Sequence, residues 1–500
     1  MEHSIVRSSL TAGAQCVGGS GMQDRSRLRR SGSVMLGASV VLALHVAAIV
    51  PAVAAAGPRP VTLEEALRAA LENSPDLAAA TARIAAARGA IVQAQSAFFP
   101  TLKVEESYTA TNDPVQAFMM TLKQRAFDLT TADFNHPGTV DNVGTRLVGR
   151  WPLYNGGRDA AARTAATLGA DAAQDEFAAA RNTLVFEVTR AFYETLKAKR
   201  FVASAGAQVT DLQSSRQLAA SRRAEGAALE TDVLDADVRL SLAREELVRA
   251  QSTVAVAEAV LSGVAGLAAT DAITAAEPAA GSDAVPEAAA PDGSHERPEI
   301  SAARKAVARA DEDIRAARGN RLPRVNAFAG YDVDSGDLAD FSDSWTAGVS
   351  VELDVFDGGR TTGAIASAVA ARNSAAAELR RVEIAVDVEL RRAQLQVEES
   401  DARLATSATA SQQAERSLAL TRERYRQGLA LFTQVLDAET SLTAARQRRD
   451  AAFFDRHIAV AALDKARGNN WTPVAEQPGM PRAGMLRAPA MGNAPRKVNK

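Results

Sequence analysis

The stretch YRQGLALFTQVLDA, residues 425–438, has the pattern of a short turn between two antiparallel helices. Gly428 is expected just after the end of the first helix, because glycine readily adopts the left-handed conformation found there. Thr433 is expected near the start of the second helix, ahead of apolar residues at helical spacing. The stretch therefore predicts a helical hairpin.

The same pattern occurs a second time, earlier in the chain. Residues 222–236 place Gly226 where the later copy has Gly428, an offset of 428 − 226 = 202 residues. A Gly-Gly-Arg sequence keeps that offset, since it occupies residues 156–158 and again residues 358–360. A repeat of this length indicates a duplicated half of the fold rather than a solenoid of short units. Strand-to-helix turns are expected at Gly156, Gly157, Gly358 and Gly359.

Four segments next to these landmarks alternate apolar and polar residues, as β-strands do. Each has about ten residues, the length that crosses a bilayer at a tilt. A half-buried strand of a soluble sheet alternates in the same way, but four such strands in a chain with no other predicted strand favour a membrane barrel. The predicted strands cover about residues 101–111, 142–154, 324–334 and 344–356.

Four strands cannot close a barrel, and open sheet edges are not tolerated in lipid. The sequence therefore predicts that several copies assemble, and a homotrimer would place twelve strands in contact with outer-membrane lipid. The first strand pair has the longer loop, residues 112–141. We expect this loop to be extracellular and tolerant of insertion, because length variation concentrates in surface loops.

Long helices make up most of the remaining chain. Uninterrupted helical patterns follow each Gly-Gly-Arg, over residues 158–225 and 360–427, and each extends about 100 Å. Small and apolar residues recur at alternating steps of three and four, which indicates a coiled-coil seam. Return helices are expected over residues 231–266 and 433–468. The predicted fold class is mainly α, with long antiparallel coiled-coil helices in a helical barrel and four strands per chain of a transmembrane β-barrel.

The N-terminal residues 1–56 have the pattern of a secretory signal peptide. Arginines precede an apolar run, and small residues ending at Ala56 favour cleavage over a transmembrane anchor. Translation from Met22 instead of Met1 would shorten an unusually long leader. No later stretch of about 18 apolar residues is found, so no transmembrane helix is expected in the mature chain. The other predicted segments are a first repeat (57–267), a linker (268–296), a second repeat (297–470) and a disordered tail (471–500).

Composition and motifs exclude several classes of function. The formal net charge of −3 and the lack of a long basic stretch disfavour a nucleic-acid partner. The five histidines are scattered without metal-ligand spacing, and the sequence has no nucleophile elbow, P-loop or dinucleotide fingerprint. We therefore expect no enzyme activity, metal or cofactor. Cys16 is the only cysteine, so no intrachain disulfide can form.

The duplicated turns, the two Gly-Gly-Arg sequences and their common spacing resemble the TolC family of outer-membrane efflux proteins, over about residues 60–470. The resemblance implies a homotrimer with a twelve-stranded barrel in the outer membrane and a long helical barrel through the periplasm. It also implies a passive exit duct for efflux or type I secretion. The implied partners are a periplasmic adaptor and an inner-membrane pump, either a resistance-type pump or a transporter ATPase.

The same resemblance places candidate residues at the periplasmic entrance. A gating tyrosine falls on Tyr425, and gate carboxylates fall on Asp232 and Asp437. The arginine of the family's best-known lock falls on Ala430, and another acidic position falls on Gln434. Three copies of the two aspartates would place six carboxylates around one constriction, which selects for cations. We expect this entrance to be locked more loosely than where the arginine is present.

Each of these residues also has a plainer interpretation. Asp437 would stabilise the first turn of its helix through the helix dipole, and Tyr425 would pack near the end of the hairpin. The leucines after the two turn glycines would contact adaptor hairpins, or would close each turn as an apolar pad. The candidate turn and adaptor-contact residues are Gly226, Leu229, Gly428 and Leu431.

A periplasmic adaptor is the alternative function, from another class of protein. An adaptor would carry one central helical hairpin flanked on both sides by lipoyl-like β segments. This chain has two predicted hairpins and two strand pairs of bilayer length. The pattern therefore favours the exit duct over the adaptor.

Overall fold

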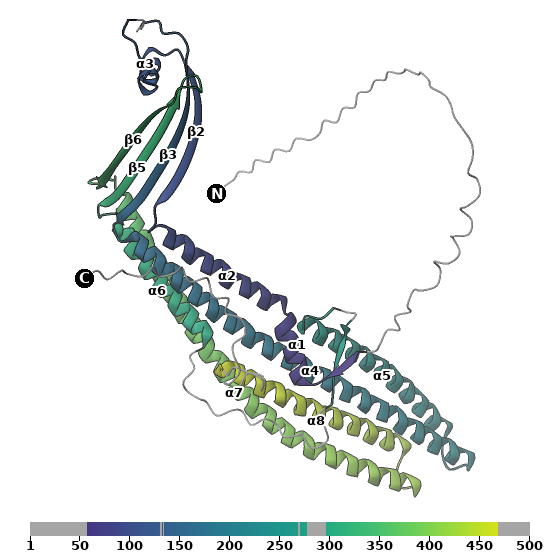
Figure 1. Cartoon of the computed structure of the whole chain (residues 1–500). Helices are drawn as coiled ribbons and strands as arrows, with labels where there is room; N and C mark the ends of the chain where they lie inside the picture. The colour runs from purple at the N-terminus through teal and green to yellow at the C-terminus, as the bar shows by residue number, and fades with distance from the viewer. Residues whose placement is uncertain (1–57, 131–132, 134, 269–270, 278–296, 469–500) are drawn as a thin grey trace, which may run out of the picture. The chain divides into compact units, whose positions relative to one another are not determined.

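The computed structural model describes residues 58–130, 133, 135–268, 271–277 and 297–468 (Figure 1). The predicted signal peptide and tail lie outside these residues, as does most of the predicted linker. The helices are α1 (Leu63–Asn73), α2 (Pro75–Ser96), α3 (Pro114–Lys123), α4 (Arg158–Ala224), α5 (Glu230–Val264), α6 (Pro298–Gly319), α7 (Arg360–Arg426) and α8 (Phe432–Arg467). The strands are β1 (Arg59–Val61), β2 (Thr101–Thr111), β3 (Val140–Asn155), β4 (Ile273–Ala275), β5 (Arg324–Ser335) and β6 (Ser342–Glu352).

Strands β2, β3, β5 and β6 form one antiparallel sheet in that order, with β2 and β6 at its edges. The register gives the sheet a polar face, because residues directly opposite each other in neighbouring strands share a face. Glu105 lies opposite Arg146, which lies opposite Asp332. Arg146 forms an ion pair with Asp332 across this face.

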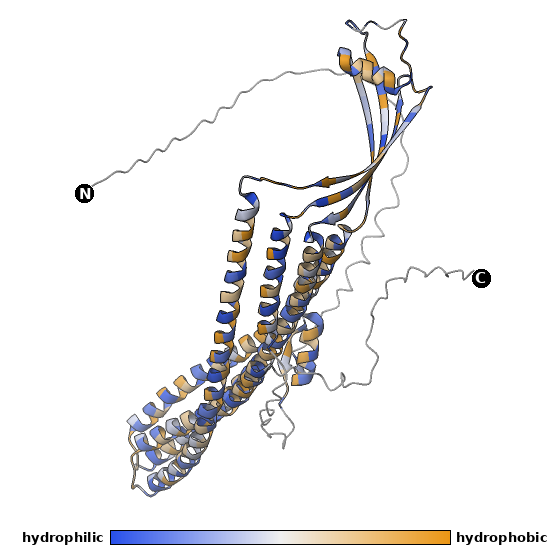
Figure 2. Cartoon of the chain, turned by 90° about the vertical axis from the view of Figure 1, so that its left-hand side faces the viewer, coloured by the Kyte–Doolittle hydropathy of each residue, from blue (hydrophilic) through white to orange (hydrophobic). Residues whose placement is uncertain are grey.

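The other face of the sheet is apolar. Val104, Leu147, Tyr331 and Trp345 lie opposite one another across all four strands. Val104 is 68% exposed and Trp345 is 75% exposed, so the described part of the chain leaves this face uncovered. Figure 2 shows the alternation of apolar and polar residues along the strands. The last strand, β6, ends at Glu352 instead of residue 356.

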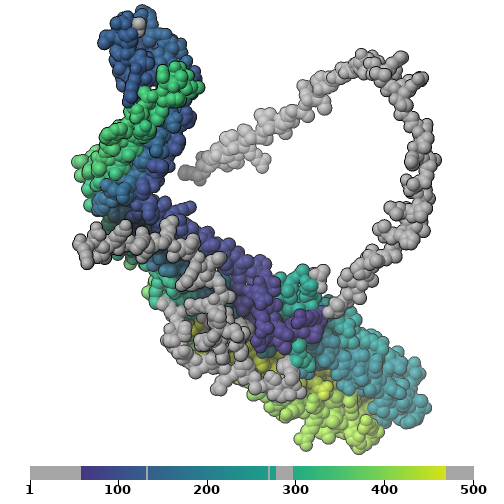
Figure 3. Space-filling view, viewed as in Figure 1, coloured from purple at the N-terminus to yellow at the C-terminus, as the bar shows by residue number. Residues whose placement is uncertain are grey.

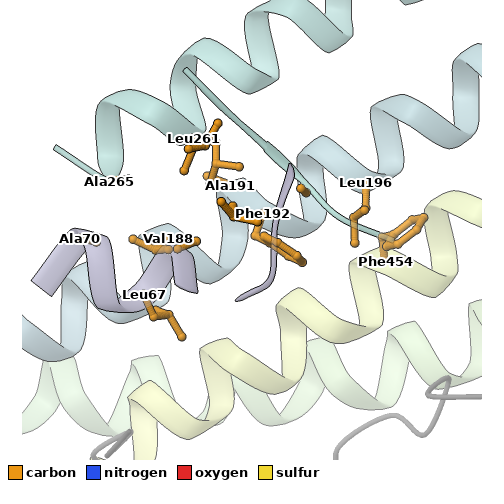
Figure 4. Packing of buried hydrophobic residues seen from close by; sticks show 13 residues of the cluster. Leu67, Ala70, Val188, Ala191, Phe192, Leu196, Leu261, Ala265 and Phe454 are labelled. Carbon is orange, nitrogen blue, oxygen red and sulfur yellow. The ribbon is translucent and has the colours of Figure 1, made fainter. Parts of the chain in front are cut away.

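The long helices pack as two antiparallel pairs, α4 with α5 and α7 with α8, and α4 also contacts α6 and α8. One core cluster joins four of the helices (Figure 4). It contains Leu67 of α1, Val188 and Phe192 of α4, Leu261 of α5 and Phe454 of α8. Val188 and Leu261 are fully buried, so the helices of both repeats meet in one core.

Two elements lie in segments that the sequence analysis assigned to a loop and to a linker. Helix α3 forms inside the loop between β2 and β3, at the far end of the sheet (Figures 1 and 3). Strand β4 lies in the predicted linker and pairs in parallel with β1, which adds a second sheet to the four predicted strands. A three-residue strand is too short for the alternation that identifies strands in a sequence.

One described helix, α5, is long and apolar enough to span a membrane by length and composition, although no such stretch was expected. Only 17% of its most apolar window is buried. Leu234, Val238 and Leu242 follow one another at four-residue spacing and are 56%, 60% and 58% exposed. Residues at this spacing share a helix face, so α5 carries an apolar stripe that the described chain does not cover.

Candidate functional site

The two hairpin turns end their helices in the same way. Gly226 and Gly428 have φ angles of +76° and +75°. After α4, Gly226 N–H donates to Arg223 O at 2.9 Å and Ala227 N–H donates to Arg222 O at 2.8 Å. This is the Schellman motif, which satisfies carbonyls at the end of a helix. The turn after α7 repeats both bonds, so the duplication extends to the hydrogen bonds of the turns.

Leucines precede both return helices. Leu229 N–H donates to Asp232 Oδ2 at 3.2 Å, and Leu431 N–H donates to Gln434 Oε1 at 3.3 Å. Each bond satisfies a backbone donor at the start of a helix. Both leucines, Leu229 and Leu431, are 69% exposed. Neither is therefore packed against its own turn as an apolar pad. Both turns therefore present a leucine to the surroundings.

Tyr425 packs in the core beside the second turn. The residue is 4% exposed, and its ring centroid lies 5.3 Å from that of Phe432. The Arg222 guanidinium lies 4.7 Å from the same ring and donates a hydrogen bond to Tyr425 O. The hydroxyl is buried without a hydrogen-bond partner among the described residues. Burial, and to a lesser degree the Asp232 carboxylate, raises the pKa of Tyr425, while Arg222 acts in the opposite direction.

The two candidate carboxylates have different surroundings. Asp232 lies in the first turn of α5, where it accepts the Leu229 N–H. The expectation that Asp437 lies in the first turn of its helix is wrong, because α8 already begins at Phe432. Asp437 instead accepts a hydrogen bond from Arg239 of α5 at 2.8 Å. Arg239, which the sequence analysis did not identify as a site residue, therefore links the two return helices.

A second cluster of charged residues links α4, α7 and α8. Glu439 of α8 is 3% exposed, and its Oε1 accepts hydrogen bonds from Arg422 Nη2 of α7 at 2.8 Å and from Ser215 Oγ of α4. Arg422 Nη2 also lies 3.3 Å from Asp211 Oδ1 of α4. Burial opposes the charge of Arg422, but the hydrogen bonds and charges of Glu439 and Asp211 outweigh it and raise the pKa of its guanidinium.

Sequence reasoning missed this cluster, although one signal for it is present. Glu439 occupies a position with helical spacing to Leu436 and Leu442, both of which are buried. A carboxylate in an apolar seam must be paired, since burying an unpaired charge is costly. The partners could not be named from the sequence, because Asp211 and Ser215 lie in the other repeat.

The strand-to-helix turns also differ from each other. Gly156, Gly157, Gly358 and Gly359 all have positive φ angles. A Cβ atom on Gly156 would lie 2.2 Å from Gly319 O at the end of α6, whereas one on Gly358 would meet nothing within 4 Å. Arg158 Nη1 donates to Asn320 Oδ1 at 2.6 Å beside the first turn. The first turn is therefore in close contact with the end of α6, whereas no described atom lies close to a Cβ added at Gly358 in the second turn.

A sequence model of the outer membrane efflux protein family matches residues 66–267 and 294–469, which is most of the described chain. The chain belongs to the outer membrane efflux protein family. The resemblance to TolC-like channels is thereby confirmed, as is the expected location in the outer membrane. The family is one of transport proteins rather than enzymes.

Individual relatives agree with this assignment. The pyoverdine export outer membrane protein OpmQ of Pseudomonas aeruginosa is 24% identical over 82% of this chain and 85% of its own length. Protein CyaE of Bordetella pertussis is 27% identical over 59% of this chain, and the match spans 60% of CyaE. The solved structure of the outer membrane protein VceC from Vibrio cholerae has a TM-score of 0.67 and is 23% identical over 81% of this chain and 96% of VceC.

The outer membrane efflux protein shows no metal site among its described residues, where no group of three or more His, Cys, Asp or Glu residues could hold an ion. The candidate functional features are the two hairpin turns, the ion pairs between the helical hairpins and the two faces of the sheet. These features position the long helices relative to one another and to the sheet.

Proposed function

We propose that the chain is one subunit of an outer-membrane exit duct, a passive conduit that carries cargo from the periplasm to the exterior. The observation that carries the proposal is the four-stranded sheet, whose strands have bilayer length and one exposed apolar face. Two of its strands lead through glycine turns into helices of 67 residues. We see no observation that favours the periplasmic adaptor.

The duct is a homotrimer in this proposal. The edge strands β2 and β6 have no partner in the described chain, and unpaired edges are not tolerated in lipid. Pairing β2 of one copy with β6 of the next closes a barrel of twelve strands, with the apolar face toward outer-membrane lipid. The apolar stripe of Leu234, Val238 and Leu242 on α5 supports assembly as well, because a neighbouring copy would cover it.

The turns at Gly226 and Gly428 form the periplasmic entrance in this proposal, because helices of 67 residues end about 100 Å from the sheet. Exposed Leu229 and Leu431 are suited to contacting the hairpin of a periplasmic adaptor, which would join the duct to an inner-membrane pump. The Tyr425 ring holds the second turn by packing.

A direct test combines mass and conductance. The mature protein, purified from outer membranes in detergent, is expected to have the mass of three chains and to form ion-conducting channels in planar bilayers. A soluble monomer would refute the proposal. So would a trimer that conducts no ions even after its periplasmic end has been opened by substitutions among Arg422, Glu439 and Asp211.

The charge of the entrance can be changed in both directions. Arg239→Ala should raise the preference of the channel for cations, because it frees three copies of Asp437, whereas Asp232→Ala should lower it. A charge about 4 Å from an ion is worth about 1 kcal/mol in water, so we expect changes of up to about fivefold. Reversal potentials across a salt gradient measure the preference. Arg249→Ala, which removes a cation paired with Glu245 on the same helix, is the control, and equal shifts in Arg249→Ala and Arg239→Ala would contradict the prediction.

A further inference from the structure

Helix α3 is a capped helix inside the loop between β2 and β3. Asp113 caps its start, because Asp113 Oδ1 accepts the N–H groups of Val115 and Gln116 at 3.1 Å and 2.9 Å. Pro114 occupies the first helical position, where a missing N–H costs nothing. The ten-residue helix is therefore specified by its own sequence, although the surrounding segment connects two strands.

The far end of α3 is bonded to the sheet. Gln124 Nε2 donates to Asp141 O at 2.7 Å and to Asn142 Oδ1 at 3.0 Å, at the start of β3. Arg125, with a φ of +54°, donates to Asp343 O at 3.0 Å, and Ser342 Oγ donates to Lys123 O. These bonds reach the start of β6 in the second repeat, so α3 is held in one orientation over both strand pairs.

That orientation places α3 over the polar face of the sheet. A cavity of about 340 Å³ lies between them, and its walls include Gln116 and Met120 of α3 and Glu105, Arg146 and Asp332 of the sheet. When the sheet closes into a barrel with its apolar face toward lipid, the polar face lines the lumen. Helix α3 then lies within the lumen, at the end opposite the strand-to-helix turns.

One side of α3 is left uncovered by the described residues of its own chain. Val115, Met119 and Leu122 are 71%, 52% and 42% exposed. Their spacing of four and three residues puts them on one stripe of the helix. Ala117, on another side of α3, is 1% exposed and faces the loop that follows the helix. Met119 also borders the cavity between α3 and the sheet, whereas Val115 and Leu122 line neither that cavity nor the one beside the loop.

We infer that the α3 helices of three copies meet through Val115, Met119 and Leu122 and form an apolar constriction at the outer mouth of the duct. The inference rests on the proposed trimer. The occupant of each stripe is the α3 helix of a second copy, because three-fold closure repeats the stripe around the lumen and each chain leaves it exposed to water. An apolar constriction blocks ions by dewetting. It is a second barrier, separate from the periplasmic turns.

The test uses cysteine cross-linking of the full chain in outer membranes, with Cys16 changed to Ser. A disulfide needs Cα atoms within about 7 Å of each other. Met119→Cys should give covalent dimers on mild oxidation, with the third subunit unlinked, because one disulfide joins two of three copies. Val115→Cys is a second variant in case Met119→Cys does not fold. The control is Leu129→Cys, which is 77% exposed and lies outside the helix.

Three outcomes are distinguishable. Dimers from a stripe cysteine but few from Leu129→Cys support the inference. A trimeric mass with no cross-link at either stripe position, or with equal cross-linking at Leu129→Cys, overturns the constriction and leaves the exit duct intact. A monomeric mass overturns the constriction together with the proposed function. As a second readout, Leu122→Asp should raise the ion conductance of a trimer, and an unchanged conductance in a channel whose periplasmic end is open would count against the inference.

Discussion

Replacing Glu439 with alanine should loosen the α7–α8 hairpin from α4 and raise the conductance of the resting channel. The change leaves Asp211 as the remaining carboxylate beside Arg422 among the described residues. Removing one partner of a buried ion pair costs about 3–5 kcal/mol, and we expect the lower end because the Arg422 side chain is 28% exposed. Thermal unfolding in detergent measures the stability, and single-channel recording measures the conductance.

The matched control is Glu415→Ala in the same hairpin. Glu415 pairs with Arg446 at 3.0 Å, but the two side chains are 46% and 35% exposed, so solvent screens the pair and its loss should cost about 0–1 kcal/mol. Replacing both charges, as Arg422→Met with Glu439→Leu, should recover much of the stability, because an apolar pair carries no desolvation penalty. If Glu439→Ala behaves like Glu415→Ala, the cluster does not hold the hairpins together.

Gly156→Ala should prevent most of the protein from reaching the outer membrane, whereas Gly358→Ala should be tolerated. Both residues have φ near +60°, where an alanine costs about 1–2 kcal/mol. At Gly156 the new methyl group would also lie 2.2 Å from Gly319 O, so the backbone of α6 or of the turn must move. We expect that movement to weaken the hydrogen bond between Arg158 and Asn320 as well.

The two variants are compared by the amount of folded, heat-resistant protein in outer-membrane fractions. The pair is well matched, because each replaces the first glycine of a Gly-Gly-Arg sequence at the end of a strand pair. Equal yields of the two variants would show that the approach of Gly156 to α6 does not limit folding. The Gly157→Ala variant measures the cost of backbone strain alone, because Gly157 has a positive φ and nothing lies within 4 Å of the added Cβ.

The sequence by itself determined the features that depend on neighbouring residues. Gly428 ends α7 because its left-handed conformation lets two N–H groups bond carbonyls only three and five residues back, and those residues are adjacent in the chain. The alternation around Val349 and Val351 specifies a strand, because side chains point to opposite faces in turn. The cap at Asp113 and Pro114 is equally local, and α3 could have been predicted from it.

Tertiary structure alone decided which distant residues meet. Gly156 and Gly358 stand in the same local sequence, yet only Gly156 touches the end of α6. Arg422 pairs with Asp211, and Arg239 with Asp437, across about 200 residues of chain. Strand β4 pairs with β1 across a similar separation along the chain. Such contacts depend on how helices from the two repeats pack against each other, and that packing is a property of the whole core rather than of any one stretch of sequence.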